Sequence, residues 1–193
     1  MQILLVDGNE KKASDRYIEN EMQTQYQIYK EVLLELSDFK INITTIHPAY
    51  IDDFIPTGTS LDDFDGIVWT GSILNIYDSG TSIERQIELA KTLLTKKNKI
   101  FGSCWGLQVL ATAAGGSVRK NPKGLEAIIS EEITLNEIGI KHPMYNLKPI
   151  KFNSFCWHYD EIENLPSNTV VLSSNSKSEV QSFTFKKNDS KVW

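Results

Sequence analysis

The chain has 193 residues and a formal net charge of −5, with 40% hydrophobic and 23% charged residues. This length and composition predict one folded domain over residues 1–193 and argue against disorder. The acidic balance excludes a general basic surface for phosphate backbones, so we expect no nucleic-acid partner. No apolar run approaches the roughly 20 residues that span a bilayer, and the N-terminus lacks the pattern of a signal peptide. We therefore expect a cytoplasmic protein with no membrane partner.

The two cysteines, Cys104 and Cys156, cannot build a disulfide framework or a four-cysteine zinc site. No His, Cys or Asp residues stand at the spacing of metal ligands, and no glycine-rich Walker pattern is present. The sequence therefore predicts no metal and no cofactor.

The first half of the chain alternates between predicted strands and helices. Residues 2–7 form an apolar run typical of a strand buried on both faces of a parallel sheet. Apolar residues at three- and four-residue steps over 18–36 predict one amphipathic helix facing a core. Residues 41–46 alternate with period two and predict a second strand, and residues 65–71 predict a third that ends in a glycine turn.

A capping box at Thr81-Ser82-Ile83-Glu84 predicts the start of the next helix, whose apolar stripe reaches Leu94. Residues 99–103 predict a fourth strand, followed by a helix that closes at Gly115-Gly116. This order predicts a doubly wound, mostly parallel α/β sheet. Short β-like pieces follow at 125–135, 150–157, 169–173 and 180–185. We expect them to form a small antiparallel region packed against the main sheet.

The segment Gly102-Ser103-Cys104-Trp105-Gly106 lies between a predicted buried strand and a predicted helix. A Gly-x-Cys-x-Gly in this place is typical of a nucleophile elbow, which exposes its central side chain at the carboxyl edge of the sheet. Small flanking residues are needed because the sharp turn crowds the backbone. The helix N-terminus predicts a lowered pKa for the Cys104 thiol, and the Trp105 amide N–H is a candidate oxyanion donor.

A second glycine turn, Thr70-Gly71-Ser72, follows the preceding strand and is expected at the same edge. A backbone amide there would complete an oxyanion hole. The alternative is that Cys104 is a small buried hydrophobe whose neighbouring glycines serve only packing. The shared edge favours the functional interpretation.

These segments resemble the class I glutamine amidotransferases, cysteine-dependent glutaminase domains that release ammonia from glutamine. The resemblance covers nearly the whole chain, and its segments are Leu4–Asp7, Asp65–Ser72, Ile100–Gln108, Phe155–Pro166, Val171–Ser174 and Val180–Phe183. The segment Ser72–Asp78 is similar to stand-alone members that look like the amidotransferase domain of GMP synthetase. The resemblance implies a flavodoxin-like sheet and a single glutamine amidotransferase-like domain.

The resemblance also implies that Cys104 attacks the side-chain carbonyl of glutamine to give a γ-glutamyl thioester. The implied oxyanion donors are Gly71, Ser72 and Trp105. The implied substrate-binding residues are Gln108, Trp157 and His158. Glutamine is the implied ligand, and a separate synthetase that uses the ammonia is the implied partner. Two departures from the family pattern stand out. Ser72 and Ile73 replace a usual glycine and proline, and Trp157 replaces a usual small residue, which would narrow the pocket or change the substrate.

The remaining candidates for acid–base chemistry receive other interpretations. His47 and His142 each precede a proline and are expected at the surface. His158 is expected to shape the glutamine site, with a role as general base as the less favoured alternative. Cys156 is expected to be a core thiol. The acidic pairs Asp52-Asp53, Asp62-Asp63 and Glu131-Glu132 are expected on solvated faces.

In the resembled family, the histidine and glutamate of the triad come from a His-Pro-Glu segment after a strand that begins Val-Trp-Gly. This sequence reaches Lys191-Val192-Trp193 after a hairpin turn expected at Lys186–Ser190. We therefore expect that this chain is a truncated version of a longer protein. The truncated chain would lack a strand, expose a sheet edge and be catalytically incomplete.

Three functions remain open from the sequence. The first is a glutaminase or amidotransferase that uses a cysteine thioester. The second is a hydrolase of γ-glutamyl compounds, which needs the same nucleophile and a wider pocket. The third is a non-catalytic member of the fold that binds a partner.

Overall fold

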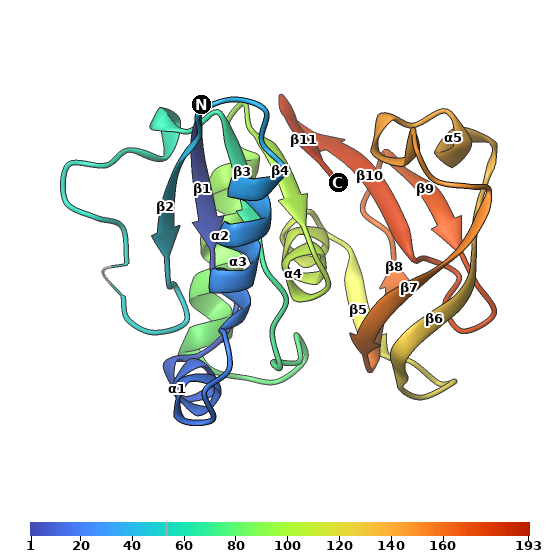
Figure 1. The fold of residues 1–193 in the computed structure, drawn as a ribbon, viewed down its shortest axis with the longest axis horizontal. Helices are drawn as coiled ribbons and strands as arrows, with labels where there is room; N and C mark the ends of the chain where they lie inside the picture. The colour runs from blue at the N-terminus through green and yellow to red at the C-terminus, as the bar shows by residue number, and fades with distance from the viewer. Residues whose placement is uncertain (53) are drawn as a thin grey trace.

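Within residues 1–52 and 54–193, which this computed structural model describes, nine strands form one sheet. Asp53, expected on a solvated face with Asp52, lies outside the described residues. The strands lie in the order β2 (Asn42–Ile46), β1 (Gln2–Val6), β3 (Gly66–Trp69), β4 (Lys99–Gly102), β11 (Ser190–Val192), β10 (Ser182–Lys187), β9 (Thr169–Ser174), β6 (Glu126–Leu135) and β7 (Lys151–His158) (Figure 1).

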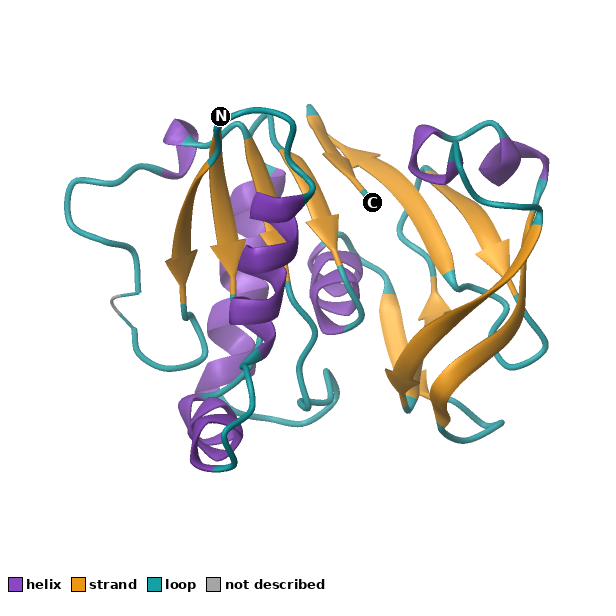
Figure 2. Ribbon diagram, viewed as in Figure 1, coloured by secondary structure: helices purple, strands orange, loops and turns teal. Residues whose placement is uncertain are grey.

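The first five strands in this order pair in parallel. Leu4, Leu5 and Val6 in β1, which has a parallel partner on each side, are almost completely buried, as the continuous apolar run predicts. Helix α2 (Gln25–Glu35) lies on one face of this half, whereas α3 (Thr81–Leu94) and α4 (Trp105–Ala113) lie on the other (Figures 1 and 2). The prediction of a mostly parallel α/β sheet is therefore confirmed.

The antiparallel half differs from the expectation because it continues the main sheet instead of packing against it. Each strand of this half pairs antiparallel with its neighbour, in the spatial order β11, β10, β9, β6 and β7. Strands β5 (Ser117–Lys120) and β8 (Asp160–Asn164) form a separate two-stranded sheet beside it. The sheet runs through both halves because β11 pairs with β4 on one side and with β10 on the other.

The C-terminal residues correct the expectation of a missing strand and an exposed edge there. Lys191 and Val192 pair in parallel with β4 and antiparallel with β10, so β11 lies inside the sheet. The Trp193 carbonyl accepts a hydrogen bond of 2.8 Å from the Gly102 N–H. The hairpin before β11 is confirmed, with β10 and β11 joined by a turn in which Asn188 has a φ of 51°.

The single helix predicted over 18–36 is wrong. Helix α1 (Lys11–Glu19) ends before a turn in which Glu21 has a φ of 57°, and α2 begins afterwards. The new start has its own capping box, in which Thr24 and Gln27 satisfy each other's backbone N–H groups. None of the α2 residues is buried, and Leu36 beyond its end is 76% exposed, so the predicted stripe does not face a core.

The capping box predicted at Thr81 is also absent. Gly80 is the N-cap of α3, and the Ser82 hydroxyl instead donates a 2.7 Å hydrogen bond to Glu10. The core lies between the parallel half and α3 and α4, and Phe183, Phe185 and Val192 extend it into the antiparallel half.

Three short helical segments complete the described elements, and these are η1 (Leu61–Asp63), α5 (Glu137–Ile140) and η2 (Pro143–Tyr145). None of the described helices is long and apolar enough to cross a bilayer.

Candidate active site around Cys104

Cys104 lies at the junction of β4 and α4 in a strained backbone conformation. Its φ of 50° and ψ of −109° fall in a region that residues with a Cβ rarely adopt. Such strain persists only where the surrounding structure enforces it. Here the Ser103 N–H donates to the Trp69 carbonyl at 3.0 Å, and the Gly106 N–H donates to the Thr70 carbonyl at 3.1 Å. These bonds hold the turn against β3 and place Cys104 at the carboxyl edge of the parallel strands.

Both glycines that flank the turn are sterically required. A Cβ at Gly102 would lie 2.6 Å from the Leu107 backbone nitrogen. A Cβ at Gly106 would lie 2.7 Å from both the Cβ and the carbonyl oxygen of Trp69. These distances are too short for any real side chain. The close packing of the backbone therefore requires glycine at both flanking positions of the Gly-x-Cys-x-Gly motif.

The Gly71–Ser72 turn lies next to Cys104, as expected from the parallel strand ends. A Cβ built on Gly71 would lie 3.7 Å from the Cys104 Cβ. The Ser72 hydroxyl accepts a 3.2 Å hydrogen bond from the Leu74 N–H, which shapes the loop after the turn. Trp105 is fully buried, and its indole N–H donates to Gln86 at 2.8 Å, so the first residue of α4 is firmly held.

Two cavities meet at Cys104. The larger, about 510 Å³, also lies against the loop from Gly71 to Asn75 and against side chains of α1 and α2. The smaller, about 290 Å³, has Phe155, Ile162 and Val180 among its lining residues. Residues common to both cavities are Ser103, Cys104, Gln108, Trp157, His158 and Asp160. The structure therefore brings together all seven site residues predicted from the sequence, with Trp105 directly behind the Cys104 turn.

The electrostatic environment of Cys104 contradicts the expected lowering of its pKa. The residue is open to solvent through the cavities, but the cavity walls crowd protein atoms around its sulfur, and this desolvation raises the pKa of the thiol. The Trp105 amide N–H acts in the opposite direction, and the nearby Asp160 raises the pKa further. The effect of the helix N-terminus is therefore outweighed by desolvation.

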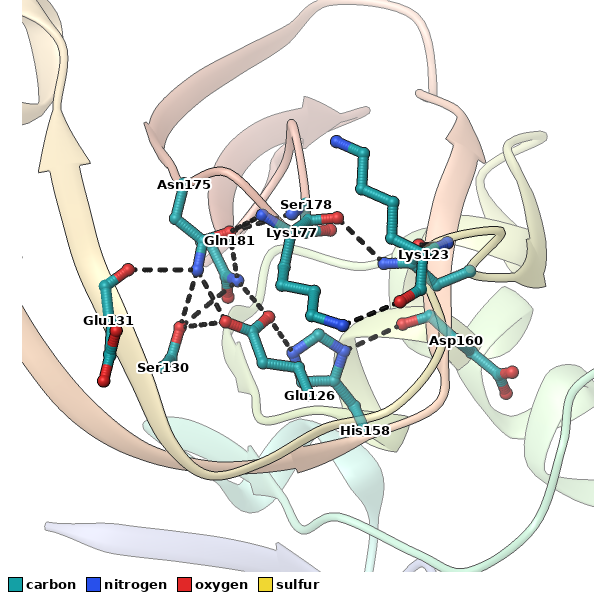
Figure 3. Close-up of polar contacts among 11 residues, drawn as sticks. Lys123, Glu126, Ser130, Glu131, His158, Asp160, Asn175, Lys177, Ser178 and Gln181 are labelled. Carbon is teal, nitrogen blue, oxygen red and sulfur yellow. Dashed lines mark hydrogen bonds and ion pairs between the residues drawn. The ribbon is translucent and has the colours of Figure 1, made fainter.

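His158 has partners on both sides of its ring. Its Nδ1 lies 3.1 Å from the Asp160 carbonyl oxygen, and its Nε2 lies 3.1 Å from the Glu126 carboxylate (Figure 3). Both partners are hydrogen-bond acceptors, so neither ring nitrogen is free to accept a proton from Cys104. This arrangement favours the expected role of His158 in shaping the site over the alternative role of general base.

The other two histidines are engaged elsewhere, and both are half-buried instead of fully exposed at the surface. His47 Nδ1 lies 3.0 Å from the carboxylate of the buried Asp7, and its ring stacks on Tyr50. His142 Nδ1 accepts a hydrogen bond from the Met144 N–H. Within the described residues, no histidine is bonded to Cys104.

Cys156 is half-buried and lines the smaller cavity, which corrects its assignment as a core thiol. Burial also raises the pKa of its thiol, and the nearby Glu126 raises it further.

Several cavity residues were not identified from the sequence. Tyr29, assigned to an apolar core stripe, lines the larger cavity, and burial raises the pKa of its hydroxyl. Asp160 is 6% exposed and accepts a 2.9 Å hydrogen bond from the Tyr77 hydroxyl. Burial raises the pKa of this carboxyl, and Asp78 adds to the rise. The one signal in the sequence that Tyr29 could line a cavity was its polar hydroxyl at a position predicted to face the core. The described residues hold no group of three or more candidate metal ligands.

Alkylation provides a direct test of the Cys104 environment. With limiting iodoacetamide, Cys104 should be labelled before Cys156, because Cys104 is exposed and Cys156 is half-buried. Since the thiolate is the nucleophile and desolvation raises the Cys104 pKa, the rate should keep rising above pH 8.5, the ordinary thiol pKa being about 8.5. Mass spectrometry of peptides labelled at several pH values measures both quantities. Faster labelling of Cys156, or a Cys104 rate that levels off near pH 7, would contradict this account.

Comparisons with known proteins agree with this geometry. The "Glutamine amidotransferase class-I" family matches residues 17–192. The chain is 30% identical over 200 residues to "Gamma-glutamyl-L-1-hydroxyisopropylamide hydrolase" of Pseudomonas sp, covering 100% of this chain and 65% of that protein. It is 27% identical over 113 residues to a glutamine-hydrolysing GMP synthase component of Methanococcus aeolicus, covering 58% of this chain and 56% of the relative. The chain thus spans less than two thirds of the length of either relative.

A solved structure supports the fold. The crystal structure of a glutamine amidotransferase from Thermotoga maritima superposes with a TM-score of 0.69 at 16% identity, covering 98% of this chain and 73% of that one. At this identity the likeness concerns the fold. Together with the family match over residues 17–192, it leads to one conclusion: the chain belongs to the class I glutamine amidotransferase family.

Proposed function

We propose that this protein hydrolyses the γ-amide bond of γ-glutamyl amines through a thioester on Cys104. The observation that carries the proposal is that two cavities meet at this one exposed cysteine. Release of ammonia from glutamine needs space for the glutamyl group alone. A second cavity of about 290 Å³ with Phe155, Ile162 and Val180 in its walls provides space for a substituted amine.

The residues around Cys104 suit each step of this reaction. The Cys104 sulfur attacks the γ-carbonyl carbon, and the resulting oxyanion is stabilised by the backbone N–H of Trp105 and an amide of the Gly71–Ser72 turn. The carbon–nitrogen bond then breaks, and the amine leaves after taking a proton. Water adds to the thioester, the carbon–sulfur bond breaks, and glutamate and the thiol are released. Gln108, buried and shared by both cavities, is the proposed polar contact to the glutamyl group.

Glutaminase activity is the second candidate, and the family match and the GMP synthase relative favour it. In that case glutamine is the substrate, and a separate synthetase uses the ammonia. The Pseudomonas relative, whose name describes a γ-glutamyl amide hydrolase, aligns with the whole of this chain and supports the first candidate.

We propose that the general base lies beyond Trp193. Strand β11 runs parallel to β4, and the Trp193 carbonyl is bonded to the Gly102 N–H, two residues before Cys104. A residue joined to Trp193 therefore emerges at the edge of the sheet where Cys104 lies. A histidine and a glutamate in such a segment would complete the triad that the described histidines do not supply.

A substrate panel tests the function. Glutamate release is measured from glutamine and from γ-glutamyl isopropylamide, with this chain and with a form extended beyond Trp193 by a His-Pro-Glu segment. We expect kcat/KM for the isopropylamide to exceed that for glutamine by about tenfold, because its amine fills the second cavity. Cys104→Ser should abolish both activities, whereas the control Glu132→Gln, an exposed residue that lines neither cavity, should retain them. A preference for glutamine would favour the glutaminase, and turnover by Cys104→Ser would refute the thioester.

A further inference from the structure

A buried carboxylate, Glu126, lies beside the Cys104 cavities and has no part in the chemistry proposed above. It is 4% exposed at the start of β6. Three neutral side chains donate to it, Ser130 and Asn175 at 2.6 Å and Gln181 at 2.7 Å (Figure 3). Burial alone would raise the pKa of Glu126, but these hydrogen bonds and the nearby His158 hold it below its ordinary value. The group is therefore an ionised carboxylate whose oxygens only accept hydrogen bonds.

The register of the sheet explains why Glu126 meets His158. The two residues are direct partners across β6 and β7, so their side chains project from the same face of the two-stranded ribbon. His158 Nε2 lies 3.1 Å from the Glu126 carboxylate, and His158 Nδ1 lies 3.1 Å from the Asp160 carbonyl oxygen. Figure 3 shows the imidazole between these two oxygens.

This geometry selects one form of the ring. A neutral imidazole donates from one nitrogen only, so its other nitrogen would direct a lone pair at an oxygen lone pair. The imidazolium donates from both nitrogens and satisfies both acceptors. Charged groups in this region include Glu126 from β6, Asp160 and Lys120 from the β8–β5 sheet, Asp78 beside Asp160, and Lys177, whose ammonium donates to the Lys123 carbonyl (Figure 3).

We propose that Glu126 is a positioning residue that holds His158 as an imidazolium and thereby fixes the Trp157–Asp160 wall of both cavities. This inference rests on the proposed function, because that wall is where the γ-glutamyl substrate would be bound. Trp157, His158 and Asp160 all line the two cavities, whereas Glu126 lines neither. Glu126 thus acts on the site through residues that it holds, His158 and also Gln181, which lines the smaller cavity, without contact with substrate.

The first measurement concerns the ring itself. In the folded wild-type protein at neutral pH, ¹⁵N NMR should find a proton on both nitrogens of His158. In Glu126→Gln, one nitrogen should lose its proton, because the amide no longer presents a carboxylate to Nε2. A neutral His158 ring in the wild-type protein would overturn the proposal even if the variant failed to fold. Glu132→Gln, an exposed carboxylate on the same strand, is the matched control and should leave the His158 signals unchanged.

The second measurement separates positioning from stability. Cys104 is alkylated either by iodoacetamide or by a chloromethyl ketone analogue of glutamine, in which the thiolate displaces chloride. Glu126→Gln should slow alkylation of Cys104 by the glutamine analogue about tenfold. It should slow alkylation by iodoacetamide less than about twofold, because only the analogue contacts the cavity wall. Equal rates for wild type and variant with the analogue would refute the positioning role. If the analogue instead shows no preference for Cys104 in the wild-type protein, the proposed function fails, which is a distinguishable result.

Discussion

A form of this protein extended beyond Trp193 by a histidine and a glutamate should cleave γ-glutamyl amides about 10³-fold faster than the 193-residue chain, since general acid–base groups typically contribute 10²–10⁴-fold. Desolvation raises the pKa of Cys104, so little thiolate exists at neutral pH without a base to take the proton. Both nitrogens of His158 face acceptors, so we propose that another residue supplies that base. Glutamate release by the two forms under identical conditions measures the difference.

The controls for this comparison come from the two histidines involved. Replacing the added histidine by glutamine should return the extended form to the rate of the shorter chain. His158→Gln in the shorter chain should slow glutamate release by about tenfold, as Glu126→Gln does, without abolishing it, if His158 shapes the cavity wall and takes no proton. If the two forms turn over substrate equally fast and His158→Gln abolishes the reaction, the base is His158 and the proposal of a distant base is wrong.

The parts of the fold that sequence reasoning predicted correctly are those set by local pattern. The apolar run in β1 and the glycines around Cys104 depend on near neighbours in the chain, and each specifies its own geometry. The break between α1 and α2 escaped notice because the apolar spacing continues across a turn that Glu21 makes with a positive φ. The capping box at Thr24 was the local signal that a second helix starts there.

Two features of the site, the contact between Glu126 and His158 and the pKa of Cys104, cannot be predicted from the spacing of residues in the sequence. Glu126 meets His158 only because β6 and β7 pair in one particular register, and their separation along the chain gives no sign of it. The pKa of Cys104 depends on how closely protein atoms surround the sulfur, whereas the motif reveals only the helix N-terminus behind it. Long-range pairing and desolvation therefore decide the electrostatics of a site whose backbone was predictable.

The close approach of Gly106 in α4 to Trp69 in β3 predicts a large effect on stability. Gly106→Ala should lower the free energy of unfolding by about 3 kcal/mol, because an added Cβ would lie 2.7 Å from the Trp69 carbonyl oxygen and overpacking of this kind costs about 1–3 kcal/mol or more. Trp69 is fully buried in β3, so its backbone has no room to retreat. Urea unfolding of the wild type and the variant measures the change.

Gly66→Ala is the matched control, because Gly66 is the first residue of β3 and Trp69, which the added Cβ of the α4 variant would meet, is the last. Its added Cβ would meet the flexible end of the Ile3 side chain at 3.3 Å, and we expect a change of less than about 1 kcal/mol, as for ordinary small substitutions. Gly106→Ala should also alter the iodoacetamide rate at Cys104, because relieving the clash moves α4 away from β3 and releases the strained turn. Equal stability losses for the two variants would show that the close approach of α4 to Trp69 does not hold the turn in place.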